Sequence, residues 1–186
     1  LGDPWVVRNP VRTNEGVLRR SLLPGLLSCV RGNRLHGVES VRLFEVARVF
    51  HRRDGVDRPV EKIHLAWVHS NADGSRPSEA YRQVRGIADA VLELLRLGTE
   101  SRSASTWNPV STSCGLAGGS CAALDFFSER LGLVGAAPLD GVTGETWCGE
   151  LDLGTLIGHS EVKHRYREFS RHPGVRRDLN IVVEES

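Results

Sequence analysis

Two pairs of side chains in this sequence have the types and spacing that acid–base or metal chemistry needs. Glu150 and Asp152 stand two positions apart on a predicted strand, so their carboxylates share one face, as in a general acid/base pair. Acidic residues at the edge of a sheet explain the same pattern, and we favour that interpretation. His64 and His69 are the nearest pair of potential metal ligands, but strand alternation places them on opposite faces. No metal site is predicted.

A basic segment near the C-terminus is the candidate for nucleic-acid chemistry. Residues 163–177 hold six lysines and arginines against one acid, with Tyr166 and Phe169 among them. Cations bind phosphates and aromatic rings stack on bases, so this segment is a candidate RNA contact, with a plain linker as the alternative. The candidate RNA-binding residues are Arg165, Arg167, Arg171, Arg176 and Arg177.

Other catalytic patterns are missing from the sequence. It contains no G-x-S-x-G motif and no cysteine beside a positioned histidine. The glycine-rich stretch 115–120 is not followed by Lys-Ser/Thr, so we interpret it as a mobile loop and not as a phosphate loop. Four scattered cysteines are typical of reduced thiols in a cytoplasmic protein. The net charge of +1 argues against a strongly basic nucleic-acid binder, and no apolar run approaches the roughly 20 residues of a membrane span.

Residues 41–50 form the element around which we expect the fold to be organised. On one face the apolar residues are Val41, Leu43, Ala47 and Val49, and on the other face they are Phe44, Val46 and Phe50. Apolar residues on both faces predict a central strand that is covered on both sides. Arg42 and Glu45 interrupt this pattern. Because a buried charge is costly unless it is paired, they are candidates for structural charged pairing.

A helix is predicted just before this strand. With Ser21 as its N-cap, Pro24 falls in the first turn, where a missing N–H has no helical partner anyway. The helix should run to about Arg34, with Gly37 marking its end. Its apolar stripe consists of Leu22, Leu26 and Val30, with Leu23 and Leu27 beside them.

Further elements follow this strand in the sequence. A second helix should begin at a Ser78 cap and end at Gly98, with one apolar face. Its face consists of Tyr81, Val84, Ala88, Val91, Leu92 and Leu95. Strands are expected at residues 5–8, 63–67, 124–127, 131–135 and 146–153, with a polar hairpin connection at 51–61 and a short strand within 99–113. Short connections between strands, with two helices, predict an α+β domain with a mainly antiparallel sheet.

Several motifs occur in a fixed order along the chain. Asn9-Pro10 is followed by L-R-R-S-L-L-P-G-L-L at residues 18–27, by Asn33, and by R-L-F-E-V-A-R-V-F at residues 42–50. This order resembles the catalytic-like region of the bacterial phenylalanyl-tRNA synthetase β subunit, apart from Arg20 in place of a usual Thr and Ala47 in place of a usual Gly. Residues 169–179 resemble the entry of that family's ferredoxin-like anticodon-binding domain.

The resemblance implies a class II synthetase-like fold that has lost catalysis. Class II enzymes hold ATP with an Arg-x-Glu pair and a glycine-rich stretch that ends in arginine. Here residues 42–45 read R-L-F-E, and residues 132–135 lack the arginine, so no catalytic residue is assigned. The resemblance further implies a core domain at residues 1–160, then a linker and a truncated first strand of the next domain at 161–186. This fragment alone would bind no cofactor and be inactive.

In that family the α subunit forms the aminoacyl-adenylate. The resemblance therefore implies an α-subunit partner in a cytoplasmic heterotetramer without membrane association. It also implies that the holoenzyme binds tRNA(Phe) and uses ATP and magnesium. The implied subunit-interface candidates are Asn9, Pro10, Arg19, Ser21, Leu22, Pro24, Leu26 and Val30. The apolar stripe could equally cover the domain's own sheet. Two other functions stay open: a free-standing regulatory module that binds an amino acid, and a small RNA-binding module.

Overall fold

The computed structural model describes residues 3–11, 16–71, 77–97, 105–109, 121–126, 129–137 and 139–160. Within these ranges the fold is α+β, with one six-stranded sheet in the order β1-β2-β6-β5-β4-β3 and every neighbouring pair antiparallel. The strands are β1 (Ser40–His51), β2 (Val60–Asn71), β3 (Ser105–Pro109), β4 (Cys121–Phe126), β5 (Glu129–Ala136) and β6 (Glu145–Asp152). The three helices of these ranges are α1 (Leu23–Leu35), α2 (Pro77–Leu94) and α4 (Leu153–Gly158). The predicted α+β class and antiparallel sheet are confirmed.

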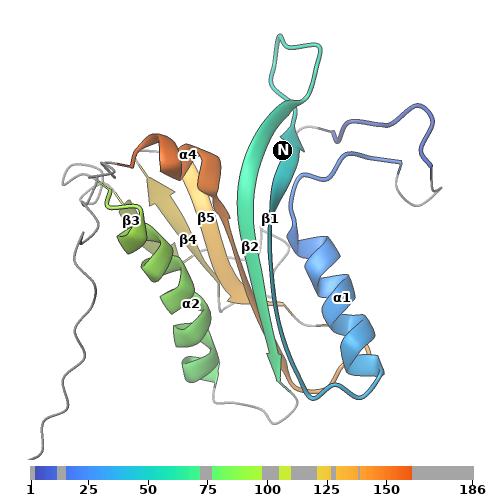
Figure 1. Cartoon of the computed structure of the whole chain (residues 1–186), viewed down its shortest axis with the longest axis vertical. Helices are drawn as coiled ribbons and strands as arrows, with labels where there is room; N and C mark the ends of the chain where they lie inside the picture. The colour runs from blue at the N-terminus through green and yellow to red at the C-terminus, as the bar shows by residue number, and fades with distance from the viewer. Residues whose placement is uncertain are drawn as a thin grey trace, which may run out of the picture.

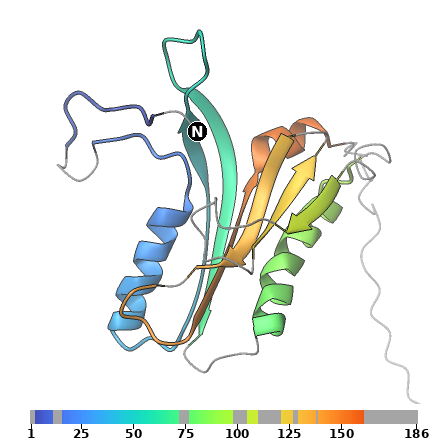
Figure 2. The same ribbon diagram turned by 180° about the vertical axis from the view of Figure 1, so that it is seen from behind.

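The helices divide between the two faces of the sheet. Helix α1 packs on β1, β2 and β6, whereas α2 packs on β6, β5 and β2 and α4 packs on β2. Figures 1 and 2 show α1 on one side of the sheet and α2 with α4 on the other. Because strand side chains alternate, the two layers have separate cores. Val30, Val49 and Val68 lie in the α1 core, and Val84 and Leu151 lie in the α2 core.

The α2 core depends on a close approach between two strands. Trp67 of β2 is 2% exposed, and its indole N–H donates to the Val84 carbonyl at 3.0 Å. Gly149 of β6 stands directly opposite Trp67 in the register. A Cβ at Gly149 would lie 2.3 Å from the indole ring, so only glycine leaves room for it. The predicted apolar face of α2 is confirmed, since Val84 and Ala88 are fully buried.

Strand β1 differs from its prediction. It stands at the edge of the sheet, and within the described part of the chain its α1 face alone is covered. Val41 and Val49 face α1 and are buried, but on the other face Phe44 is 75% exposed and Val46 is 51% exposed. The prediction of a central, doubly covered strand is therefore wrong for the described residues. The physical reason is the position of α2, which packs over β2, β6 and β5.

The predicted helix boundaries are close to those observed. Helix α1 contains Pro24 in its first turn and is followed by Gly37 at φ +86°, as expected. The cap position belongs to Leu22 and not to Ser21. Helix α2 begins at Pro77, one residue before the predicted Ser78 cap. None of the helices in the described ranges is both long and apolar enough to cross a membrane.

Most of the remaining strand predictions are confirmed. The hairpins β1–β2 and β4–β5 and strand β6 lie where they were expected, and β3 falls inside the predicted irregular region. Among the described residues, the expected strand at residues 5–8 forms a single isolated bridge, between Val6 and Val17. The glycine-rich stretch 115–120, Gly98 and residues 161–186 lie outside the described residues. The domain division near residue 160 therefore stays a prediction.

Candidate functional site

A buried polar cluster lies on the α1 face of the sheet, beside the start of α1. Its centre is Glu150 of β6, whose side chain is 7% exposed. One carboxylate oxygen accepts from the Ser21 hydroxyl at 2.5 Å, and the other accepts from the Leu22 backbone N–H at 3.0 Å and from His64 Nδ1 at 2.9 Å. An anion is favourable at a helix N-terminus, where backbone N–H groups lack helical partners. Glu150 thus ties α1 to both β2 and β6.

Asp152, two residues further along β6, has a similar structural role. It accepts from Lys62 of β2 at 2.7 Å and from the backbone N–H and hydroxyl of Thr155 at 3.0 and 2.9 Å. Burial alone would raise the pKa of Asp152, but these hydrogen bonds outweigh it and hold the pKa below its ordinary value. The carboxylate caps α4 while it also joins α4 to the sheet.

The two carboxylates do share one face, as predicted, but the interpretation as acids at the edge of a sheet is wrong. Strand β6 is an interior strand between β2 and β5, and Glu150 and Asp152 are 6% and 5% exposed. Buried carboxylates of this kind need partners, and both have several. The acceptor sites are engaged by structural donors, so the arrangement holds elements together.

Two histidines complete the cluster. His64 Nδ1 lies 2.9 Å from a Glu150 carboxylate oxygen, and in the tautomer that carries the Nδ1 proton it donates to that oxygen. The His51 ring lies 5.8 Å from the His64 ring, centroid to centroid. Burial, with His64 and Lys62 nearby, lowers the pKa of His51. His69 contacts Arg42 on the other face, which confirms that His64 and His69 point to opposite sides.

Arg42 and Glu45 have separate partners. Glu45 lies on the α1 face and pairs with Arg19 at 2.8 Å, and Arg19 also donates to the Arg48 carbonyl at 3.0 Å. Arg42 lies on the α2 face and donates to His69 Nε2 at 3.3 Å. Their three-residue spacing puts them on opposite faces of β1, so each takes its partner from its own side.

The subunit-interface candidates fall into two groups. Leu22, Leu26 and Val30 are 1%, 6% and 0% exposed, within the domain's own core. Covering its own sheet therefore accounts for the apolar stripe. The other candidates reach the surface: Asn9, Arg19 and Pro24 are exposed, and Pro10 and Ser21 are partly buried. The candidate RNA-binding arginines between 165 and 177 lie outside the described residues.

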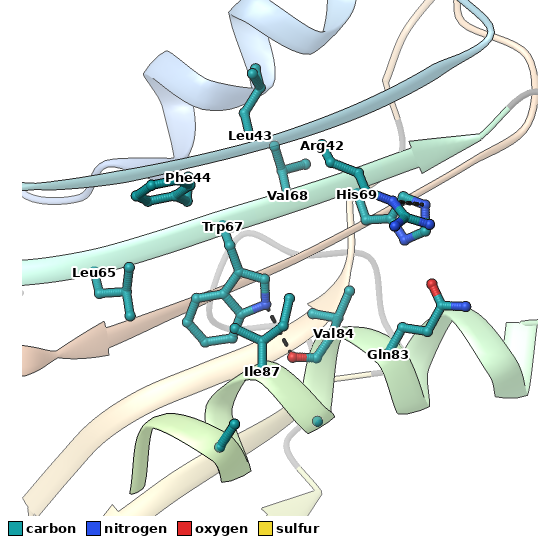
Figure 3. Close-up of a pocket in the computed structure, with 12 residues that line it drawn as sticks. Arg42, Leu43, Phe44, Leu65, Trp67, Val68, His69, Gln83, Val84 and Ile87 are labelled. Carbon is teal, nitrogen blue, oxygen red and sulfur yellow. Dashed lines mark hydrogen bonds between the residues drawn. The ribbon is translucent and has the colours of Figure 1, made fainter. Parts of the chain in front are cut away.

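A groove runs along the α2 face between the β1–β2 hairpin and α2, with a volume of about 710 Å³. Figure 3 shows Phe44, Leu65 and Trp67 on the sheet side and Ile87 on the helix side. Phe44 and Ile87 are exposed, whereas Trp67 forms the buried floor. The sequence did not predict this groove, because β1 was expected to be covered.

The Glu150–Ser21 hydrogen bond was also missed from the sequence. Its two residues are 129 positions apart. The available signals were a serine two residues before a helix and an acid within a buried strand pattern. Either signal alone is too common to pair two particular residues.

The sequence of this chain is similar to those of known proteins. Residues 2–138 match the family described as Phenylalanyl tRNA synthetase beta chain CLM domain. Phenylalanine–tRNA ligase β subunits are similar over nearly the whole chain. The one from Geobacillus kaustophilus is 28% identical over 99% of this chain, and the one from Bacillus licheniformis is 30% identical over 95%. A third, from Chromobacterium violaceum, is 28% identical over 99%.

The chain spans about a quarter of the length of these relatives, with 24%, 22% and 23% of each covered, respectively. The family match extends over most of the chain, from the N-terminal segment through β5. The chain therefore belongs to the phenylalanyl-tRNA synthetase β-chain family.

Proposed function

We propose that this chain is a non-catalytic domain of a phenylalanine–tRNA ligase β subunit that supports assembly with the α subunit. The family match over residues 2–138 is the observation that carries the proposal. The relatives are named as β subunits of this ligase. In the assembled enzyme the α subunit charges tRNA(Phe), and ATP and magnesium serve that subunit.

The fold supports a class II synthetase-like assignment. A broad antiparallel sheet flanked by helices is the architecture expected for that class, and the described residues have it. The polar cluster supports the loss of catalysis. Its two carboxylates accept hydrogen bonds from α1, α4, His64 and Lys62. Groups engaged in this way stabilise the fold and are poorly suited to proton transfer or ligand binding.

Co-purification of the full-length β chain with its α subunit, followed by light scattering, tests the assembly function. We expect a stable complex. Asn9→Glu, at an exposed interface candidate, should weaken the complex while leaving the β chain folded. A charge at Leu26 is the matched folding control, because it disrupts the internal core whether or not a partner binds. A folded β chain that does not associate with α would refute the proposal.

The RNA-binding module stays a second hypothesis for residues 165–177. Charge reversal at Arg176 and Arg177 should reduce tRNA affinity and its dependence on salt without affecting subunit assembly. Unchanged affinity would leave this segment as a linker.

A further inference from the structure

The α2 face of the β1–β2 hairpin presents an apolar surface that nothing in the described residues covers. Phe44 is 75% exposed, Val46 51% and Ile63 43%, and Ile87 of α2 borders the same groove at 43%. Phe44 and Val46 stand opposite Trp67 and Leu65 in the β1–β2 register, so their side chains form one continuous surface. A contiguous apolar patch of this kind marks a binding site for another element.

The dimensions of the open face correspond to one helix. Two neighbouring strands give about 10 Å of sheet width, which is about the diameter of a helix with its side chains. Helix α2 packs on the adjoining part of the same sheet face, over β2, β6 and β5. Its groove side includes Gly86 and Ala90, and a Cβ added at Gly86 would meet nothing within 4 Å. A second helix could therefore lie close beside α2.

The charged residues beside this surface indicate which side chains the docked helix should carry. Arg42 stands at one end of the surface and Arg48 toward the other, on the same face as Phe44 and Val46. Arg48 already pairs with Glu61 at 3.1 Å, whereas Arg42 donates to the His69 ring. The occupant should be amphipathic, with aliphatic residues over Phe44 and Val46 and a carboxylate near Arg42.

We infer that the occupant is an amphipathic helix of the same polypeptide, from a part of the β subunit that the relatives' greater length provides beyond the 186 residues compared with them. The relatives are about four times as long as this chain, so most of such a subunit is available to supply it. A phenylalanine this exposed on a 12-residue edge strand would promote aggregation unless it is permanently covered. A tethered helix covers it at high effective concentration before any partner is met. This inference goes beyond the assembly function and holds without an α subunit.

Thiol labelling of the full-length β chain tests the inference. In a background with Cys29→Ser and Cys114→Ser, one variant carries Val46→Cys and the matched control carries Leu35→Cys. Val46 and Leu35 are similarly exposed here, at 51% and 58%, but Leu35 lies on α1, on the other side of the sheet. Mass spectrometry measures the labelling rate of each introduced thiol. We expect the thiol at position 46 to react at least roughly tenfold more slowly than the thiol at position 35, at every protein concentration and with or without the α subunit.

Other labelling results would overturn the inference. Equal rates for the two introduced thiols would mean that the face is open. Protection at position 46 that rises with protein concentration would identify a second copy of the chain, and protection only after α is added would identify the α subunit. Loss of α binding in a β chain that is still protected at position 46 would refute the assembly function alone.

A photo-crosslinking phenylalanine analogue at Phe44 gives the direct readout of what covers the surface. Phe44 is the most exposed of the apolar side chains on this face, so the analogue would contact the occupant first. The expected product is an intramolecular crosslink to a peptide outside these 186 residues. An intermolecular product, or an intramolecular crosslink to a peptide within these 186 residues, would contradict the inference.

Discussion

Replacing Glu150 by alanine should destabilise the domain far more than replacing Glu45. The Glu150 carboxylate accepts three hydrogen bonds, from Ser21, Leu22 and His64, and is 7% exposed. Alanine leaves those three donors without an acceptor inside the protein. At about 1 kcal/mol for each bond, the free energy of unfolding should fall by about 3 kcal/mol. A loss of that size is a large part of the roughly 5–15 kcal/mol typical of a domain.

Glu45→Ala is the matched control. This carboxylate is 34% exposed and makes an ion pair with Arg19, which is 47% exposed. Exposed pairs of this kind contribute about 0–1 kcal/mol. Glu150→Gln should fall between the two, because the amide keeps one acceptor oxygen. Urea unfolding followed by tryptophan fluorescence measures all three variants. A Glu150→Ala variant within about 1 kcal/mol of the parent chain, or no more destabilised than Glu45→Ala, would refute the structural role of the cluster.

Two further perturbations test the packing and the electrostatics. Gly149→Ala would place a methyl group 2.3 Å from the Trp67 ring, so the free energy of unfolding should fall by at least ~2 kcal/mol. The control is Gly32→Ala on α1, where the added methyl group meets nothing within 4 Å and should raise the free energy of unfolding slightly. Equal effects of the two substitutions would contradict the close approach of Gly149 and Trp67. Burial lowers the pKa of His51 from 6.5, so the unfolded chain binds a proton more readily than the folded chain. The contribution of His51 to stability should therefore be fully present above pH 6.5 and should be lost as the pH falls toward the pKa of the folded state. The His51→Asn variant should show a flatter dependence of stability on pH in this range. Urea unfolding at a series of pH values measures both curves.

Local patterns predicted the elements of this fold well. The position of Pro24, the stop at Gly37 and the apolar face of α2 follow from backbone rules and helical periodicity, which act over a few residues. The β1–β2 hairpin followed from two apolar runs and the polar turn between them. These features depend on neighbours in the sequence, so the sequence contains enough information to predict them.

The order of the strands did not follow from local patterns. Strand β6 inserts beside β2 although the facing residues Ser70 and Thr146 are 76 positions apart in the sequence. Because β6 is an interior strand, Glu150 is buried and holds α1 against the sheet, whereas an acid at the edge of the sheet was expected. The apolar pattern of β1 indicates a strand whose two faces both favour burial. Among the described residues nothing covers its outer face, because α2 lies over β2, β6 and β5.

The same limit applies to the candidate site. Sequence resemblance identified the family, and the match over residues 2–138 confirmed it. It did not show which of Ser21, Leu22 and Leu26 were available to a partner, because burial depends on the three-dimensional packing of α1. All three serve the domain's own fold, with Ser21 bonded to Glu150 and both leucines in the core.

Phenylalanine-dependent exchange of pyrophosphate into ATP by the assembled α/β enzyme tests the central claim most directly. The variant to use is His51→Asn, since His51 belongs to the polar cluster but makes none of the bonds that anchor α1. If this domain is non-catalytic, the assembled variant should exchange pyrophosphate at the rate of the parent enzyme. A roughly tenfold or greater fall in kcat, with subunit assembly intact, would contradict the account and place the cluster in the reaction.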